Sequence, residues 1–143
     1  MTDKIHIRWE EFHQDVKTVC KKIKSSGTYN KIVAISRGGL LPAGIIAYEL
    51  DIRNCHSLNI ATYIGGEHRQ LERLENLEDA GTVDEKTLIV DDLSDSGQTF
   101  HLLRKEFPQA RYVSIYSKPA GLNEVDIYAR ELPDQWIVFP WDI

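Results

Sequence analysis

Apolar residues recur near the start of the chain at the spacing of one helix face, which predicts a helix that ends at Gly27. The apolar positions of that face are Trp9, Phe12, Val16, Val19, Cys20 and Ile23. Residues 31–36 then form a short apolar run, typical of a parallel strand that is covered on both sides. A turn follows at residues 37–39, and Pro42 fits the first turn of a second helix. The apolar positions of this second helix are Leu41, Ile45, Ile46 and Leu50.

Apolar runs and helical spacings alternate through the rest of the chain. Residues 57–61, 87–90 and 112–116 are expected to form strands, and 125–128 a further short strand. A helix that follows an acidic turn presents Phe100, Leu103 and Phe107. Strands that alternate with helices predict an α/β domain with a mainly parallel sheet. Since no repeat, low-complexity tract or linker interrupts this pattern, we expect one domain over residues 1–143.

Two stretches differ from this pattern. Residues 62–85 are polar, charged and interrupted by glycines. Connections of this length in a compact domain are usually functional lids or disordered, so we expect a mobile lid there. Residues 136–143 are largely aromatic and apolar, and we expect this tail to pack against another part of the protein.

Composition narrows the possible partners. The 143 residues carry 17 Lys and Arg against 22 Asp and Glu, a net charge of -5, which gives no broad attraction to nucleic acid or anionic lipid. No apolar run is long enough to span a bilayer, and the first residues lack the apolar region of a signal peptide. The two cysteines, Cys20 and Cys55, are too few for a disulfide framework. We therefore expect a soluble protein of the reducing cytoplasm.

The most informative stretch is residues 88–99, where an apolar strand leads into Asp91, Asp92 and Asp95 and then a Gly-containing turn into a helix. In an open parallel sheet, ligands bind beyond the carboxyl ends of the strands, where this turn lies. The N–H and hydroxyl groups of such a turn suit a phosphate, whereas carboxylates suit sugar hydroxyls and Mg²⁺. The stretch therefore indicates a ligand such as phosphoribosyl pyrophosphate.

Single residues of this stretch have simpler interpretations. Asp95, Ser96 or Thr99, taken alone, is better explained as a cap of the following helix. An Asp-Asp pair alone is ordinary at a solvated turn. The run as a whole favours the phosphate site.

Residues 88–99 resemble the phosphoribosyl pyrophosphate signature of type I phosphoribosyltransferases, in which apolar residues precede two acids and a D-[ST]-G-x-T turn. Residues 34–40, 118–121 and 136–142 resemble, in order and approximate spacing, the bacterial xanthine-guanine branch of that family. The resemblance implies a mainly parallel sheet flanked by helices, with a small hood over the base at residues 118–143. It also implies a purine salvage enzyme that transfers 5-phosphoribosyl to guanine, xanthine or hypoxanthine.

The resemblance implies roles for residues around the sugar. Asp91 and Asp92 would hold the ribose hydroxyls, with Asp92 also near Mg²⁺. Asp95 would lie beside the purine N7 and accept or donate its proton. The sugar phosphate would be bound by Leu93, Ser94, Asp95, Ser96, Gly97, Gln98 and Thr99.

It also implies roles for residues around the pyrophosphate and the base. Arg37 and Gly38 would bind pyrophosphate, in a loop that often carries a strained or cis peptide in this family, and Arg69 would reach it when the lid closes. The purine would be bound by Lys118 at O6, by stacking on Trp136, and by the backbones of Ile137 and Asp142 at its 6-oxo and 2-substituent edge. Taken alone, Lys118 suits a surface lysine, Trp136 a core residue and Arg69 a solvated helix face.

The chain departs from the family pattern at three places. Ser94 replaces a usual aliphatic residue, and Gln98 stands where a second glycine is common. The chain ends at Ile143, whereas the resembling enzymes continue, so we expect a shorter hood and a possible change in base choice.

Two other functions compete with this enzyme. A nucleotide-sensing regulator or RNA-binding protein of the same fold would lack a catalytic group or show a basic face, whereas Asp95, Lys118 and Trp136 are present and the chain is acidic. A pyrimidine transferase is opposed by the lysine and tryptophan, which suit a 6-oxopurine. The resemblance further implies a homotetramer and, in some members, loose association with membranes.

Overall fold

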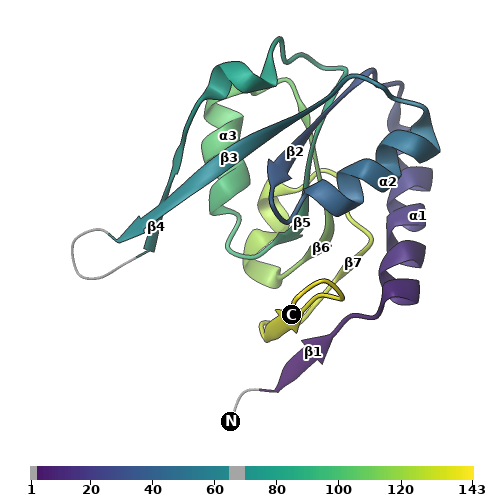
Figure 1. Ribbon diagram of the computed structural model, residues 1–143, viewed down its shortest axis with the longest axis vertical. Helices are drawn as coiled ribbons and strands as arrows, with labels where there is room; N and C mark the ends of the chain where they lie inside the picture. Colours follow the sequence, from purple (N-terminus) through teal and green to yellow (C-terminus); the bar gives the residue numbers. More distant parts are fainter. Residues whose placement is uncertain (1–2, 65–69) are drawn as a thin grey trace.

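The computed structural model describes residues 3–64 and 70–143, without the side chains of 61–64 and 70–72. Its centre is a six-stranded sheet in the order β4-β3-β2-β5-β6-β7 (Figure 1). Its strands are β2 (Lys31–Ser36), β3 (Cys55–Ile64), β4 (Gln70–Leu74), β5 (Thr87–Ser94), β6 (Arg111–Ser117) and β7 (Arg130–Glu131). β3 and β4 pair antiparallel, and the other neighbours pair parallel. The mainly parallel α/β sheet is therefore confirmed.

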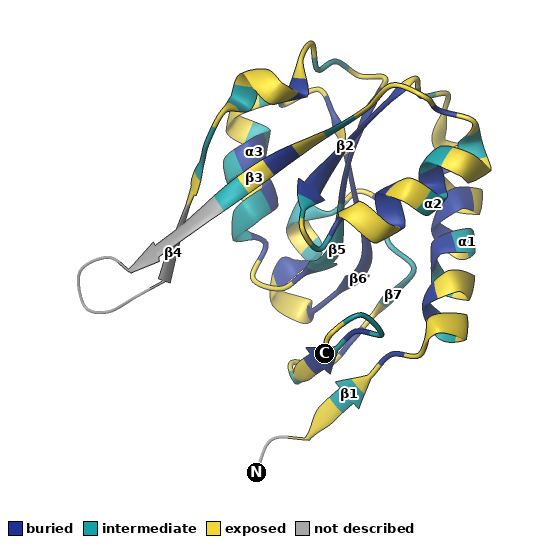
Figure 2. Cartoon of the chain, viewed as in Figure 1, coloured by how far each residue is buried: buried dark blue, intermediate teal, exposed yellow. Residues whose placement is uncertain are grey.

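Helices cover both faces of this sheet. The long helices α1 (Trp9–Ser26) and α2 (Leu40–Leu50) lie on one face, and α3 (Gln98–Glu106) lies on the other with the short helix η2 (Leu77–Ala80). Successive side chains of β2 alternate between the two layers, because Ile32 packs in the cluster with α1 and α2 while Val33 packs with α3. This double coverage explains the continuous apolar run of the central strands, which are buried along most of their length (Figure 2).

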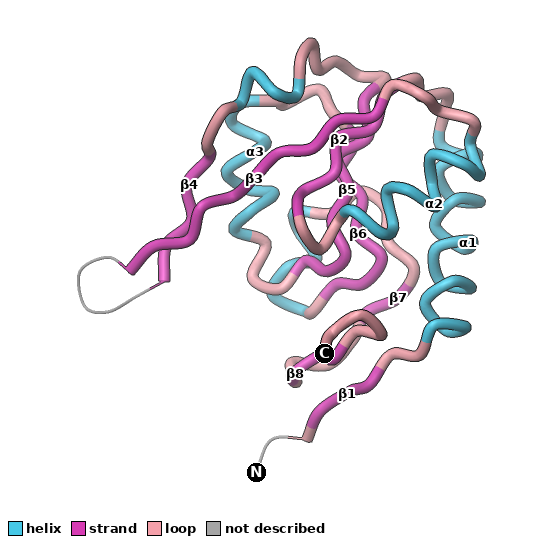
Figure 3. Tube along the Cα trace, viewed as in Figure 1, coloured by secondary structure: helices cyan, strands magenta, loops and turns pink. Residues whose placement is uncertain are grey.

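A small second sheet joins the two ends of the chain. β1 (Lys4–His6) pairs in parallel with β8 (Trp136–Val138), so that Ile5 lies opposite Ile137 (Figure 3). The apolar tail thus packs against the N-terminal segment, and the Trp141 ring lies 4.9 Å from the Phe12 ring of α1. Sequence analysis did not predict β1, because three residues with a single half-buried apolar side chain give no recognisable pattern.

Two predicted strands differ from those observed. The strand expected at residues 57–61 is longer, and the polar stretch 62–85 supplies the end of β3 together with β4 and η2. The strand expected at residues 125–128 is wrong: Ile127 makes an isolated bridge to Val113, and the strand lies further on, at β7. The reason is local, since the Asp126 carboxylate accepts the Tyr112 N–H at 2.8 Å in place of a main-chain carbonyl.

Candidate active site

The loop after β2 and the end of β5 approach each other closely at the carboxyl edge of the sheet. A Cβ added to Gly39 would lie 2.3 Å from the Val90 carbonyl oxygen, and one added to Gly38 would lie 2.6 Å from Asp92 Oδ2. A larger residue would therefore push this loop away from the acidic strand end. The Ser36–Arg37 peptide bond in the same loop is cis, as the family resemblance implies.

Asp91 and Asp92 lie next to each other at the end of β5 and are both half-buried. The Asp92 N–H donates to Asp91 Oδ1 at 2.8 Å. Burial raises the pKa of the Asp92 carboxyl above its ordinary value; hydrogen bonds with the Asp91 side chain and the main chain lower it, and the Asp142 carboxylate raises it again. A divalent cation would offset the cost of ionising Asp92, because its charge favours the carboxylate.

Asp92 is a side chain that could hold Mg²⁺ at this strand end. Within residues 3–64 and 70–143, no group of three or more His, Cys, Asp or Glu side chains is arranged to hold a metal by itself. Mg²⁺ usually takes one or two carboxylates and completes its shell with water and substrate phosphates. The donor set thus fits a cation that is bound together with a phosphorylated substrate.

The turn after β5 leads directly into α3. Gly97 is the N-cap residue of that helix, with φ +86°, a conformation that glycine adopts without steric cost. Asp95, Ser96 and Thr99 are therefore not the conventional cap, although Ser96 Oγ accepts the Gln98 N–H at 3.2 Å. The turn encloses a hollow of about 190 Å³, lined by Asp91, Leu93, Ser94, Asp95, Ser96, Gly97, Gln98, Thr99 and Phe100. N–H groups at a helix N-terminus make such a hollow favourable for an anion.

The serine that departs from the family pattern lines this hollow, but its hydroxyl is bound to a neighbouring loop. Ser94 is 5% exposed, and its hydroxyl donates to the Gly121 carbonyl at 3.0 Å. A Cβ on Gly121 would lie 2.4 Å from Ser94 Oγ, so the two segments are in direct contact. The Ser94 hydroxyl thus holds the neighbouring loop, and a phosphate contact of this residue would have to come from its main chain.

Lys118 is buried, with 7% of the residue exposed, which contradicts the interpretation as a surface lysine. Its ammonium lies 3.3 Å from Asp95 Oδ1 and 3.7 Å from Asp134 Oδ1. The Lys118 N–H also donates to the Ser94 carbonyl at 2.9 Å. The lysine predicted to contact the base and the aspartate predicted to exchange its proton are therefore adjacent.

The C-terminal segment presents Trp136 and buries other aromatic side chains. Trp136 is 66% exposed, which contradicts its interpretation as a core residue, whereas Ile137 is buried. Asp142 closes a turn, because Asp142 Oδ2 accepts the Phe139 N–H at 2.8 Å and the Asp142 N–H donates back to the Phe139 carbonyl at 3.0 Å. Trp141 is half-buried and packs against the core instead, with its ring stacked on Phe139 at 4.8 Å and an interplanar angle of 7°.

Two arginines that were predicted to bind pyrophosphate are not among the site contacts described above. Arg37 is exposed, and Arg69 lies outside the described residues. Asp134 and Glu124 were not predicted from the sequence. Asp134 contacts the Lys118 ammonium, and Glu124 contacts the Arg104 guanidinium. A lone acid in a polar loop carries no signal that would have separated either residue from ordinary surface acids.

A parallel sheet with two adjacent acids at one strand end, followed by a Gly-containing turn into a helix N-terminus, is the arrangement expected of a phosphoribosyltransferase. A family model described as "phosphoribosyl transferase domain" matches residues 7–143, and the chain belongs to this family. Xanthine-guanine phosphoribosyltransferase of Nitratidesulfovibrio vulgaris strain Hildenborough is 41% identical over 138 residues, covering 95% of this chain and 83% of the relative. The enzyme of the same name from Idiomarina loihiensis is 37% identical over 140 residues, covering 96% and 86%.

The fold has a similar counterpart among solved structures. Purine phosphoribosyltransferase from Pyrococcus horikoshii Ot3 superposes with a TM-score of 0.84 at 26% identity, covering 99% of this chain and 95% of that chain. The type I phosphoribosyltransferase fold predicted from the sequence is confirmed.

Proposed function

We propose that this chain transfers the 5-phosphoribosyl group of phosphoribosyl pyrophosphate to guanine or xanthine, and also to hypoxanthine. The bond from the sugar C1 to pyrophosphate breaks, a bond from C1 to a purine nitrogen forms, and the products are a nucleoside monophosphate and pyrophosphate. The observation that carries the proposal is the 3.3 Å contact of buried Lys118 with Asp95 beside the phosphate-binding turn.

This pair suits one edge of a 6-oxopurine. O6 and N7 lie next to each other on that edge, so Lys118 would donate to O6 while Asp95 accepts the proton from N7 as the purine attacks. A general base of this kind contributes roughly 10²–10⁴-fold to the rate. Exposed Trp136 would stack on the ring, and the backbones of Ile137 and Asp142 would contact its 6-oxo and 2-substituent edge.

The acidic strand end suits the ribose. Asp91 and Asp92 would bind its two hydroxyls, with Asp92 also near Mg²⁺, and the turn from Leu93 to Thr99 would bind the 5′-phosphate. The reacting sugar is electron-poor, so catalysis depends mainly on neutralising the departing pyrophosphate and on positioning the base. When bound, Mg²⁺ supplies part of that neutralising charge.

The pyrophosphate would lie over the loop after β2. Arg37 and the Gly38 main chain would bind it there, and Arg69 would reach it from residues 62–85, which we propose to act as the lid. Closing such a lid excludes water, which would otherwise hydrolyse the reactive sugar.

Incubating the protein with phosphoribosyl pyrophosphate, Mg²⁺ and a panel of bases tests this function directly. We expect nucleotide formation with guanine and xanthine, less with hypoxanthine, and none with pyrimidines. Nucleotide binding without turnover of any base would favour the regulator, and turnover of a pyrimidine alone would favour the other transferase.

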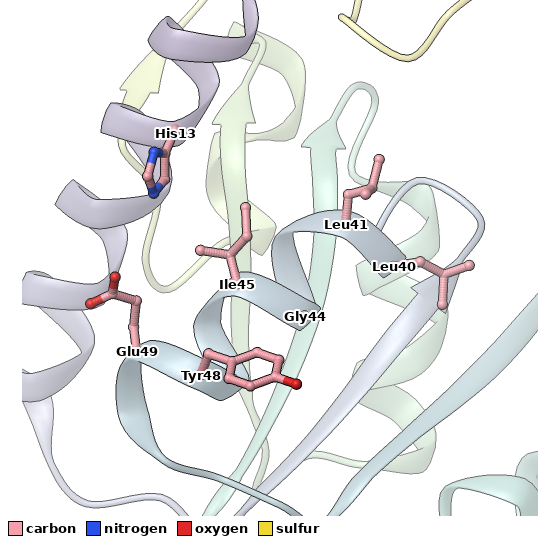
Figure 4. A pocket seen from close by; sticks show the side chains of 7 residues that line it. All are labelled: His13, Leu40, Leu41, Gly44, Ile45, Tyr48 and Glu49. Carbon is pink, nitrogen blue, oxygen red and sulfur yellow. The ribbon is translucent and has the colours of Figure 1, made fainter.

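We also propose that the chain assembles as a homo-oligomer, with the tetramer implied by the resemblance. α2 is apolar along most of its length, yet its Tyr48 is 92% exposed, and an all-round apolar helix is normally covered. A hollow of about 640 Å³ lies along it (Figure 4), lined by His13, Leu40, Leu41, Gly44, Ile45, Tyr48 and Glu49. Figure 4 shows the Tyr48 ring and Leu41 projecting outward from the helix.

Light scattering after gel filtration tests this assembly. We expect a mass of several chains for the wild type and a smaller mass for Tyr48→Glu, because a buried unpaired carboxylate opposes association. The substitution Glu106→Gln, at an exposed position of α3, is the control that should leave the mass unchanged. A monomeric wild type would contradict the proposal.

We propose the cytoplasm as the location of the reaction, because Cys20 and Cys55 are free thiols and phosphoribosyl pyrophosphate is a highly charged metabolite. In the part of the chain that the structure describes, no helix has the length and apolar character to cross a membrane. Labelling of the exposed Cys55 thiol in intact and lysed cells would test this location.

A further inference from the structure

A short helix connects the base-binding lysine to the phosphate-binding turn. η3 (Pro119–Glu124) starts directly after Lys118, whose ammonium contacts Asp95. At its other end, a Cβ placed on Gly97 would lie 2.9 Å from Glu124 Cγ. Glu124 therefore packs on the glycine that shapes the N-terminus of α3.

Glu124 is also fastened to α3 itself. Its carboxylate contacts His101 Nδ1 at 3.1 Å and Arg104 Nε at 3.5 Å, and both partners lie on α3. The Glu124 carbonyl accepts from Arg104 Nε at 3.2 Å and from Arg104 Nη2 at 2.8 Å. One residue thus binds the helix through its side chain and its main chain, directly beside Gly97.

Arg104 is held in place from other directions. Its Nη2 lies 3.2 Å from Asp126 Oδ2, and its guanidinium lies over the Tyr112 ring at 4.3 Å from the centroid. The side chains of Arg104 and Glu124 are 29% and 24% exposed, so solvent screens this pair only in part, whereas His101 is largely exposed. The Arg104–Glu124 contact is therefore the firm part of the attachment.

The opposite end of η3 is attached to β5 by separate groups. The Lys118 N–H donates to the Ser94 carbonyl and the Ser94 hydroxyl donates to the Gly121 carbonyl. A change at Glu124 therefore leaves the contacts that place Lys118 intact. The two ends of η3 are separable by mutation.

We infer that Glu124 is a positioning residue for the phosphate-binding turn: it clamps η3 to α3 and holds Gly97 and the first N–H groups of α3 in the conformation that binds the 5′-phosphate. The inference rests on the proposed transferase function. Glu124 acts through the turn, while Lys118 and Ser94 set the base side of the site.

The test compares Glu124→Ala with Glu124→Gln, which keeps the length and one acceptor oxygen of the side chain. Glu124→Ala removes the hydrogen bond with His101 and the ion pair with Arg104 but keeps the bonds to the Glu124 carbonyl. This loss corresponds to about a three- to tenfold effect. We expect Glu124→Ala to raise the KM for phosphoribosyl pyrophosphate by about that factor, with the purine KM and the melting temperature little changed. Glu124→Gln should recover most of the loss, and Glu106→Ala, at an exposed position of α3, should behave as wild type.

Calorimetry of ribose 5-phosphate binding supplies a readout without turnover, and the affinity should fall by the same factor in Glu124→Ala. An unchanged KM for phosphoribosyl pyrophosphate, or an equal rise of both KM values, would overturn the inference, the second because it indicates a general structural defect. If Glu124→Ala does not fold, Arg104→Lys is judged by the same criteria. A wild type without transferase activity would instead contradict the proposed function, while the ribose 5-phosphate measurement still tests the clamp.

Discussion

The sugar-phosphate side and the base side of the candidate site are built in different ways. The sugar-phosphate side comes almost entirely from one continuous stretch, from the end of β5 to the start of α3, with Gly38 packed against it. The base side combines Lys118, from the end of β6, with the C-terminal segment around Trp136, which is itself held by β1. The first side depends on local backbone geometry, whereas the second depends on contacts between distant parts of the chain.

This difference has a physical consequence for mutations. If main-chain N–H groups of the continuous turn bind the ligand, as proposed, single side-chain changes that keep the backbone should have limited effects. On the base side, individual side chains make the contacts, so their removal should affect purine binding or proton transfer selectively. The three substitutions below test that distinction, in order of decreasing expected effect.

Replacing Asp95 should have the largest effect, because this carboxylate belongs to the continuous turn but is proposed to exchange a proton with the base. We expect Asp95→Ala to lower kcat by roughly 10²–10⁴-fold, as for loss of a general base, while phosphoribosyl pyrophosphate binding stays largely intact. Steady-state kinetics with guanine and calorimetry of phosphoribosyl pyrophosphate with Mg²⁺ measure the two quantities.

Asp134→Asn is the matched control, since Asp134 also contacts the Lys118 ammonium, at 3.7 Å, but is 89% exposed. Its turnover should remain near that of the wild type, because exposed ion pairs contribute little. Near-normal turnover of Asp95→Ala would remove Asp95 from the mechanism. Equal losses in both variants would indicate that neutralising Lys118, and not proton transfer, is what matters.

Replacing Trp136 should affect the base side alone. Base–aromatic stacking contributes about 1–3 kcal/mol, so we expect Trp136→Ala to raise the purine KM by roughly 5- to 100-fold with a much smaller change for phosphoribosyl pyrophosphate. Since Trp136 is 66% exposed, the melting temperature should hardly change.

Trp141→Ala provides the contrast, because Trp141 packs against Phe12 and Phe139. This substitution should lower the free energy of unfolding by about 1–3 kcal/mol, less than for a fully buried aromatic side chain, because Trp141 is half-buried. If Trp136→Ala raised both KM values equally or destabilised the fold as Trp141→Ala does, Trp136 would be structural.

The same division explains which features the sequence alone could predict. The stretch from Asp91 to Thr99 carries strand, acids, glycine and hydroxyls in one run, so its geometry follows from local rules. β1 and the partners of Lys118 depend on pairing between residues far apart in sequence, which periodicity does not reveal. Ser94 illustrates the limit: its departure from the family pattern was visible, but its partner Gly121 became apparent only in the structure.

The smallest expected effect concerns Asp92 and the cost of its burial. Burial raises the pKa of the folded Asp92 carboxyl above the unfolded value of about 3.9, so folding favours its neutral form. The resulting loss of stability is absent below the unfolded pKa, grows as the pH rises through the folded pKa, and then stays constant. Asparagine resembles the neutral carboxyl, so Asp92→Asn should melt above wild type at about pH 7 but not at about pH 4.

The ligand should reverse this order at neutral pH. Saturating phosphoribosyl pyrophosphate with Mg²⁺ stabilises the state that binds it, and we expect a rise of the wild-type melting temperature that Asp92→Asn largely lacks. Thermal denaturation of both proteins at the two pH values, with and without this ligand, measures these differences in melting temperature. Asp134→Asn serves as the control for an exposed acid. If Asp92→Asn stabilised the protein equally at both pH values, the destabilising effect of Asp92 would come from the shape of its side chain and not from its charge. An equal ligand-induced rise of the melting temperature in both proteins would exclude Asp92 from the site that binds the sugar and the metal. The continuous turn would then bind the substrate without help from this buried acid.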